Sequence, residues 1–196
     1  MLTERRADLT ELRSRNYERL RERLATASGL LVESAHYEEA DPVRLAQAHA
    51  IVLSGSSAPW AAHAPADLER LGDVVRAAGK PVLGICAGLQ LQVLFAGGAV
   101  APAAVPERGF LPVVVHEHSD LLRGLPGEIV VFHDHTDEVT RLPEGVRVLA
   151  SSAGCAVQAI ADPERRWWGT QFHPEEFDAA HPAGEQILRT FFALAQ

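Results

Sequence analysis

Short apolar runs alternate with helical segments through the first half of the chain, and this alternation restricts the folds open to it. The runs cover Gly29 to Ser34, His49 to Ser54 and Pro81 to Ile85, and Gly, Pro and Ser bound them, as is typical of buried parallel strands. Helical patterns occupy residues 65–78 and 87–96. Strands that alternate with helices predict an α/β fold, with a doubly wound, mostly parallel sheet flanked by helices.

The second half of the chain is rich in predicted strands. Five more apolar runs, separated by short turns, lie at Phe110 to Val115, Glu128 to Phe132, Val146 to Ala150, Ala156 to Ile160 and Arg166 to Phe172. Apolar side chains on one stripe predict a final helix over about residues 183–195. The C-terminal half should therefore be β-rich and end in a helix.

The N-terminal segment is expected to be helical, which is atypical for such a fold. Residues 8–27 carry leucines at helical spacing and are followed by Gly29, a common helix terminator. Arginines and glutamates are interleaved along the same segment, as on an exposed helix face. Because no apolar run precedes Gly29, we expect residues 1–28 to form no strand.

Size and charge narrow the possible functions. The 196 residues, of which 47% are hydrophobic, suffice for a buried core, and we expect a single domain over residues 1–196. Asp plus Glu number 26 against 18 for Lys plus Arg, and the net charge of −8 argues against nucleic acid or an anionic membrane as a partner. The chain begins without a signal-peptide core, and glycine and proline break its longest apolar stretch, so a cytoplasmic location is expected.

A cysteine stands where the third predicted strand runs into a helix. In the segment Lys80 to Gln90, Cys86 has Gly84 and Gly88 two residues to either side. This is the pattern of a nucleophile elbow, in which a sharp turn exposes the sulfur and a helix N-terminus stabilises the thiolate. A buried structural cysteine would give the same pattern, so the motif alone leaves both interpretations open.

The last predicted strand ends in a histidine and a carboxylate two residues apart. Pro174 keeps His173 extended, so His173 and Glu175 should point the same way. Glu175 could then accept the imidazole Nδ1–H while Nε2 faces a nucleophile, and Glu176 would face away. A surface histidine at a strand end is the alternative.

A loop of small residues, Leu53-Ser-Gly55-Ser-Ser57, follows the second predicted strand. Its backbone N–H, together with that of Ala87, could form the two-donor oxyanion hole that acyl transfer needs. An ordinary turn is the alternative. The oxyanion loop, the cysteine and the His-x-Glu pair each lie at the carboxyl end of a predicted strand, and this shared position favours a common site.

Two of these segments resemble the signatures of class I (triad) glutamine amidotransferases. The segments are Gly84-Ile-Cys86-Ala-Gly88-Leu-Gln90 and Gln171-Phe-His173-Pro-Glu175, and Leu53-Ser-Gly55 is similar to the oxyanion loop of the family. Residues 107–109, 132–139 and 142–150 resemble the glutaminase domains of GMP synthetases. The resemblance covers residues 49–178 and implies the flavodoxin-like architecture of class I glutaminases.

The resemblance also implies an activity and roles for the residues. The chain would be a cysteine amidohydrolase, in which Cys86 attacks the glutamine carboxamide to form a γ-glutamyl thioester. His173 would shuttle the proton, Glu175 would orient His173, and Gly55 and Ala87 would form the oxyanion hole.

Further positions match the family's substrate pocket. Gln90, Gly109 and His135 match positions that hold the backbone of the glutamine substrate or line its pocket. The substrate would be L-glutamine or a related γ-glutamyl amide, and the ammonia would pass to a separate synthetase subunit.

The sequence departs from the family pattern at several positions. Ser56 replaces the second glycine of the oxyanion loop, Ala87 replaces a bulky residue, and Asp134 stands where a small polar residue is usual. Members of the family also open with an apolar strand, whereas this chain opens with a charged helix. Its sheet is therefore expected to have one strand fewer than the sheets of its relatives.

Two other functions remain open. Ser56 and Ala87 allow a stand-alone cysteine hydrolase of γ-glutamyl or other amides. The unusual N-terminus allows a regulatory module that keeps the fold without turnover, although the complete Cys-His-Glu set argues against it.

Neither a cofactor nor a metal site is expected. His116-Glu-His118 and His133-Asp-His135 have spacings that metal ligands also show, but alternation along a strand explains both spacings. Cys155, the second of two cysteines, is expected to be an inert packed thiol rather than half of a disulfide.

Overall fold

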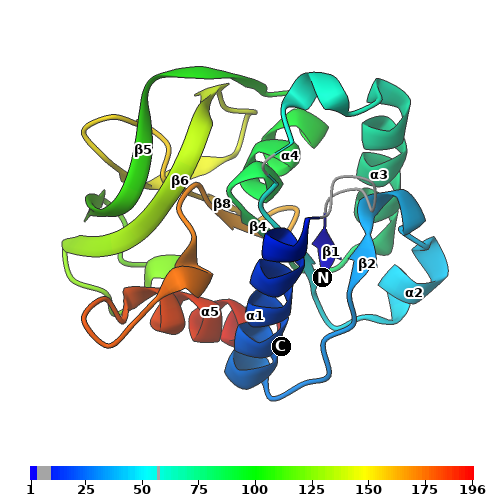
Figure 1. Ribbon diagram of the computed structural model, residues 1–196, viewed down its shortest axis with the longest axis horizontal. Helices are drawn as coiled ribbons and strands as arrows, with labels where there is room; N and C mark the ends of the chain where they lie inside the picture. The colour runs from blue at the N-terminus through cyan, green and yellow to red at the C-terminus, as the bar shows by residue number, and fades with distance from the viewer. Residues whose placement is uncertain (4–9, 57) are drawn as a thin grey trace.

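A single mixed sheet organises the chain in the computed structural model, which describes residues 1–3, 10–56 and 58–196 (Figure 1). The strand order is β2-β1-β3-β4-β9-β8-β7-β5-β6. The strands are β1 (Leu2–Thr3), β2 (Ala35–His36), β3 (Ile51–Leu53), β4 (Val82–Ile85), β5 (Ala99–Val115), β6 (Glu128–Arg141), β7 (Arg147–Ser151), β8 (Ala159–Asp162) and β9 (Trp167–Thr170). The α-helices are α1 (Glu11–Ser28), α2 (Pro42–Gln47), α3 (Pro65–Ala78), α4 (Ala87–Phe95) and α5 (Ala183–Leu194).

The sheet divides into a parallel and an antiparallel half. The pairs from β2 through β1, β3 and β4 to β9 are parallel. The pairs from β9 through β8, β7 and β5 to β6 are antiparallel. The predicted α/β fold is therefore confirmed, and the β-rich C-terminal half forms the antiparallel part of a mixed sheet.

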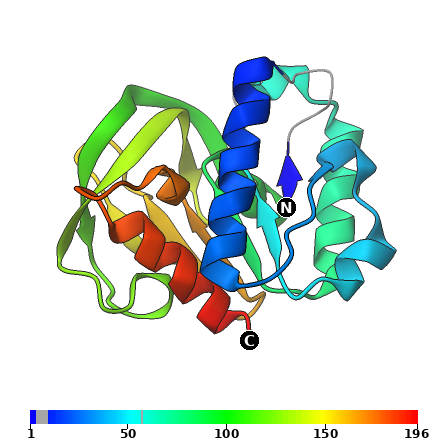
Figure 2. The ribbon, with the colours of Figure 1, turned by 60° about the horizontal axis from the view of Figure 1, so that its bottom comes forward.

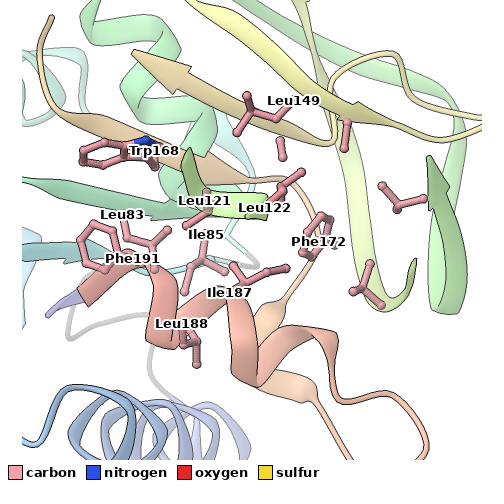
Figure 3. Packing of buried hydrophobic residues seen from close by; sticks show 14 of the residues in the cluster. Leu83, Ile85, Leu121, Leu122, Leu149, Trp168, Phe172, Ile187, Leu188 and Phe191 are labelled. Atoms are coloured by element: carbon pink, nitrogen blue, oxygen red, sulfur yellow. The ribbon is translucent and has the colours of Figure 1, made fainter. Parts of the chain in front are cut away.

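Helices cover both faces of the parallel half, because alternate residues of its strands point to opposite sides. Leu83 and Ile85 of β4 pack in one apolar cluster with α1 and α5, which lie side by side (Figure 2). Val82 of the same strand packs with α3 in a second cluster. Figure 3 shows Leu83 and Ile85 close to Phe191 of α5 in the first cluster, which contains the largest buried side chains.

The prediction that residues 1–28 form no strand is wrong. β1 lies inside the sheet, with Leu2 paired to Ala35 of β2 and to Leu53 of β3, and the sheet is not one strand short at this position. Two paired residues are enough for a strand between two neighbours, but they are too few to produce the apolar run on which the prediction depended.

The predicted N-terminal helix is confirmed as α1, while its first residues, 8 and 9, lie outside the described part of the chain. The Thr10 hydroxyl accepts a hydrogen bond from the Arg13 amide, and Gly29 ends the helix with φ of 68°. The strand predicted from Gly29 to Ser34 does not form in these described residues. Leu31 is 84% exposed, so the apolar residues that suggested a strand are not buried.

The strand predicted from Ala156 begins later, at Ala159, so Cys155 lies in the turn before β8. Cys155 is nevertheless buried, and both cysteines are free thiols. Among the described helices, none is both long and apolar enough to cross a membrane.

Candidate active site

Cys86 occupies a strained turn between β4 and α4. Its φ of 52° and ψ of −109° are unusual for a residue other than glycine, and such conformations cost about 1–3 kcal/mol. The turn fits only because glycine stands nearby: a Cβ on Gly88 would lie 2.1 Å from the Leu53 carbonyl oxygen. The Cys86 amide donates to the Thr170 carbonyl at 2.7 Å, which ties the turn to β9. The structure therefore has the sharp strand-to-helix turn that the sequence predicts at Cys86.

His173 and Glu175 meet as the spacing predicts, although the local backbone differs. The His173 amide donates to the Phe132 carbonyl at 2.8 Å, and its ring Nδ1 lies 2.9 Å from Glu175 Oε1. Glu175 belongs to a 3₁₀ turn, Pro174–Glu176, rather than to an extended segment. Glu176 points away from the ring and forms an ion pair with Arg19 of α1.

Gly55 brings the oxyanion loop against both Cys86 and His173. A Cβ added at Gly55 would lie 2.9 Å from the His173 ring and 3.6 Å from the Cys86 Cβ. Burial disfavours a charged His173, but the nearby Glu175 and Cys86 outweigh it and raise the pKa of His173 well above its usual value. A protonated imidazole beside the sulfur is the arrangement that favours a thiolate.

A cavity of about 450 Å³ opens beside the sulfur. Cys86 lines it together with Ala87, Gln90 and His135, for which the family resemblance implies roles in the site. Arg108 and Asp134 also line it, with Arg108 Nε 3.7 Å from Asp134 Oδ1 and both side chains mostly exposed. The cavity thus presents a cation and an anion within reach of the candidate nucleophile.

Comparison with known proteins shows the family to which the chain belongs. The family model described as glutamine amidotransferase class-I matches residues 14–195. The chain belongs to this family. It resembles a crystal structure from Thermoplasma acidophilum, described as a putative subunit protein of GMP synthase, with a TM-score of 0.82, 31% identity and coverage of 99% of this chain and 92% of that one.

Curated relatives of this class I amidotransferase agree with the structural match. The chain is 38% identical over 174 residues to a glutamine-hydrolysing GMP synthase of Syntrophomonas wolfei, covering 88% of this chain and 32% of that protein. It is 43% identical over 117 residues to a glutamine-hydrolysing GMP synthase subunit of Methanoregula boonei, covering 59% of this chain and 62% of that protein. The matches thus span 32% and 62% of the lengths of these two relatives.

The oxyanion loop of this family member is held by side chains on both sides. The Gly55 carbonyl accepts hydrogen bonds from the Tyr17 hydroxyl at 3.1 Å and from the Ser54 hydroxyl at 3.0 Å. The described residues with positive φ, glycine apart, are Cys86, Asp120 and Arg166, so Ser56 does not adopt a left-handed conformation here. Tyr17 was not among the predicted site residues, because it lies 38 positions away from Gly55 in the chain.

Two of the predicted substrate-binding residues line the cavity, and the third does not. Gln90 and His135 are part of its wall, whereas Gly109 is not among the described lining residues and its neighbour Arg108 is. Gly109 pairs with His133 across β5 and β6 and has φ of 86°. Glycine adopts this left-handed conformation without steric cost, so the backbone accounts for a glycine at this position. The cavity lining also includes Tyr37 and His63, which the sequence did not indicate and which are in mutual hydrogen-bond contact at 3.1 Å.

His133 and His135 alternate on β6 as expected and converge on Glu107, and the three donor groups lie close enough to hold a metal ion. Glu107 Oε2 is 2.9 Å from His135 Nε2 and 3.3 Å from His133 Nδ1, although the latter pair is not aligned for a hydrogen bond. Ser152 and Gln158 also donate to this carboxylate, which gives it partners without a metal. Burial outweighs the attraction of Glu107 and lowers the pKa of His133 to about 4.

The other candidate histidine pair does not converge. His116 Nε2 lies 2.7 Å from the Ser151 hydroxyl, while His118 Nδ1 lies 2.9 Å from the Leu125 carbonyl. Each of these contacts is an ordinary hydrogen bond, and the two rings serve different neighbours.

Proposed function

We propose that this chain is a glutaminase that hydrolyses the side-chain amide of L-glutamine and supplies ammonia to a separate synthetase subunit. The observation that carries the proposal is the approach of Gly55 and His173 to Cys86, which lines the cavity. Glu175 completes the set through its contact with the imidazole. These contacts support the chemical role proposed for each of the four residues.

The proposed reaction follows from these positions. The Cys86 thiolate attacks the amide carbon, and the backbone N–H groups of the oxyanion loop and of Ala87 stabilise the tetrahedral oxyanion. Protonated His173 gives its proton to the leaving nitrogen, so ammonia departs and a γ-glutamyl thioester remains. His173 then takes a proton from water as the water attacks the thioester, which releases glutamate and restores the thiolate–imidazolium pair.

The charges at the cavity suit an amino-acid substrate. Arg108 can bind an α-carboxylate and Asp134 an α-ammonium group. Gln90 adds a second acceptor for the ammonium group: its Nε2 donates to the Asp137 carbonyl and to Gln171, which leaves its Oε1 for the substrate. These contacts support glutamine over an amide that lacks the α-amino acid group.

The relatives suggest which partner to test first. Two of them are named as GMP synthases, one of these as a single subunit of that enzyme, so the partner we propose is the synthetase that forms GMP. A cytoplasmic location is part of the same proposal, because a catalytic thiol needs a reducing compartment.

A stand-alone amide hydrolase is the second candidate, since Ala87 and Ser56 are small at the cavity wall. Ammonia release from L-glutamine and from a panel of γ-glutamyl amides, with and without the GMP-forming synthetase, separates the two. The proposal predicts that glutamine is the best substrate and that the synthetase raises its turnover. Preference for another amide, or no effect of any synthetase, would favour the second candidate.

A further inference from the structure

A buried glutamine side chain reaches the candidate nucleophile from the side of β9. Gln171 directly follows β9 and is completely buried. Its side-chain Nε2 lies 3.6 Å from Cys86 Sγ, and its Oε1 lies 3.0 Å from Gln90 Nε2. The contact with sulfur joins residues 85 positions apart in the chain.

The hydrogen-bond network determines which end of the Gln171 amide faces the sulfur. The Asp137 carbonyl can only accept, and it lies 2.9 Å from Gln90 Nε2, so this atom of Gln90 must be the NH₂ group. The second hydrogen of that group points to Gln171 Oε1, which must therefore be the accepting oxygen. The remaining end of Gln171, its NH₂ group, then donates toward Cys86.

A donor aimed at sulfur changes the balance between thiol and thiolate. An N–H group stabilises the thiolate more than the thiol, because hydrogen bonds to a charged acceptor are stronger. The same contact also stabilises the sulfur when it leaves the thioester as a thiolate. We propose that Gln171 is a catalytic residue that donates a hydrogen bond to Cys86 Sγ and stabilises the negative charge that this sulfur carries as nucleophile and as leaving group, with Gln90 holding its amide in the donating orientation.

This inference deepens the function proposed above, but it can be tested without glutamine. The rate of Cys86 alkylation by iodoacetamide, measured against pH, reports ionisation of the Cys86–His173 pair. Gln171→Met keeps the size of the side chain and removes the donor, so the apparent midpoint should rise by about one pH unit, a tenfold change in the thiol–thiolate equilibrium. Gln171→Glu should also raise it, because its carboxylate would repel the thiolate.

Gln92 provides a matched control on α4. It is also a buried glutamine, but its Nε2 donates to the Val82 and Trp168 carbonyls, away from the sulfur. Gln92→Met should leave the midpoint where the wild type has it. A folded Gln171→Met or Gln171→Glu variant with the wild-type midpoint would overturn the proposal, whether or not the chain turns over glutamine. The rise expected in Gln171→Met supports the lost donor, and an unchanged midpoint in either folded variant contradicts it.

Discussion

The two thiols of the chain lie in contrasting surroundings. Cys86 lines the cavity at the start of α4 beside His173. Cys155 is 2% exposed, its sulfur donates to the Val157 carbonyl, and burial raises the pKa of its thiol to about 12. Near neutral pH, brief treatment with iodoacetamide should therefore modify Cys86 and leave Cys155 intact, as peptide mapping can show. Preferential labelling of Cys155 would remove Cys86 as the nucleophile.

Glu175 and Glu176 are neighbours in the chain but have different partners. Glu175 contacts the His173 ring, and its Oε2 is a buried atom without a hydrogen-bond partner among the described residues. Glu175→Gln keeps an acceptor and removes the charge that raises the pKa of His173, so turnover should fall by about 100-fold or more while folding is retained. Steady-state kinetics measures the turnover, and circular dichroism shows whether the variant is folded.

Glu176→Gln is the matched control for this experiment, because Glu176 pairs with exposed Arg19 and exposed ion pairs contribute little. It should turn over glutamine at nearly the wild-type rate. If Glu175→Gln were as active as the wild type, another group would have to orient His173.

At the scale of elements, α1 contacts the oxyanion loop and lies beside the turn that carries Glu175. Tyr17, Leu20 and Leu24 lie on one helical stripe, so burial of the two leucines directs Tyr17 toward the Gly55 carbonyl. Arg19 meets Glu176 beside the same site. The N-terminal helix is therefore part of the scaffold that holds the candidate site.

The hydroxyl of Tyr17 should matter for rate more than for binding. Tyr17→Phe removes one of two hydrogen bonds to Gly55 and loosens the oxyanion loop, so kcat should fall about tenfold with KM little changed. Tyr37→Phe is a matched tyrosine change in the cavity lining, where KM should respond instead. Equal kcat values for Tyr17→Phe and the wild type would mean that α1 does not position the loop.

We expect Ser56 to hold the same loop in a conformation that is not the active one. If the active loop needs the left-handed conformation that a glycine would adopt, serine resists it by about 1–2 kcal/mol, and docking of the synthetase could supply that energy. Turnover by the isolated chain should then rise in Ser56→Gly. The upper bound of this rise is about 10²–10³-fold, the loss of kcat that removal of one oxyanion donor causes. Assays of each protein alone decide this. A wild type that is already fast, with no gain in Ser56→Gly, would contradict gating by a partner.

The sequence predicted those elements whose signals are local. The apolar runs at β3 and β4 and the glycines around Cys86 report a buried strand and a tight turn, and both were found. β1 was not predicted, because two residues are too few to show a hydrophobic periodicity. The contacts of Tyr17 with Gly55 and of Gln171 with Cys86 join distant segments, so their geometry depends on the assembled sheet rather than on any local pattern.

At the scale of the whole molecule, the candidate site lies where the two halves of the sheet meet. The parallel half supplies Cys86 and the oxyanion loop after β4 and β3. The antiparallel half supplies the Phe132 carbonyl that anchors His173, and the charged residues Arg108 and Asp134 at the cavity. β9 pairs with both halves and leads into His173, which explains how distant segments form one site.

The central claim is that Cys86 forms a covalent γ-glutamyl thioester, and acid quenching during turnover tests it most directly. Protein mixed with L-glutamine, quenched within the first turnovers and analysed by intact mass and peptide mapping, should carry one γ-glutamyl group on the peptide that contains Cys86. Cys86→Ala should carry none and release no ammonia. Ammonia release that persists in Cys86→Ala, or an adduct on a different residue, would contradict the account.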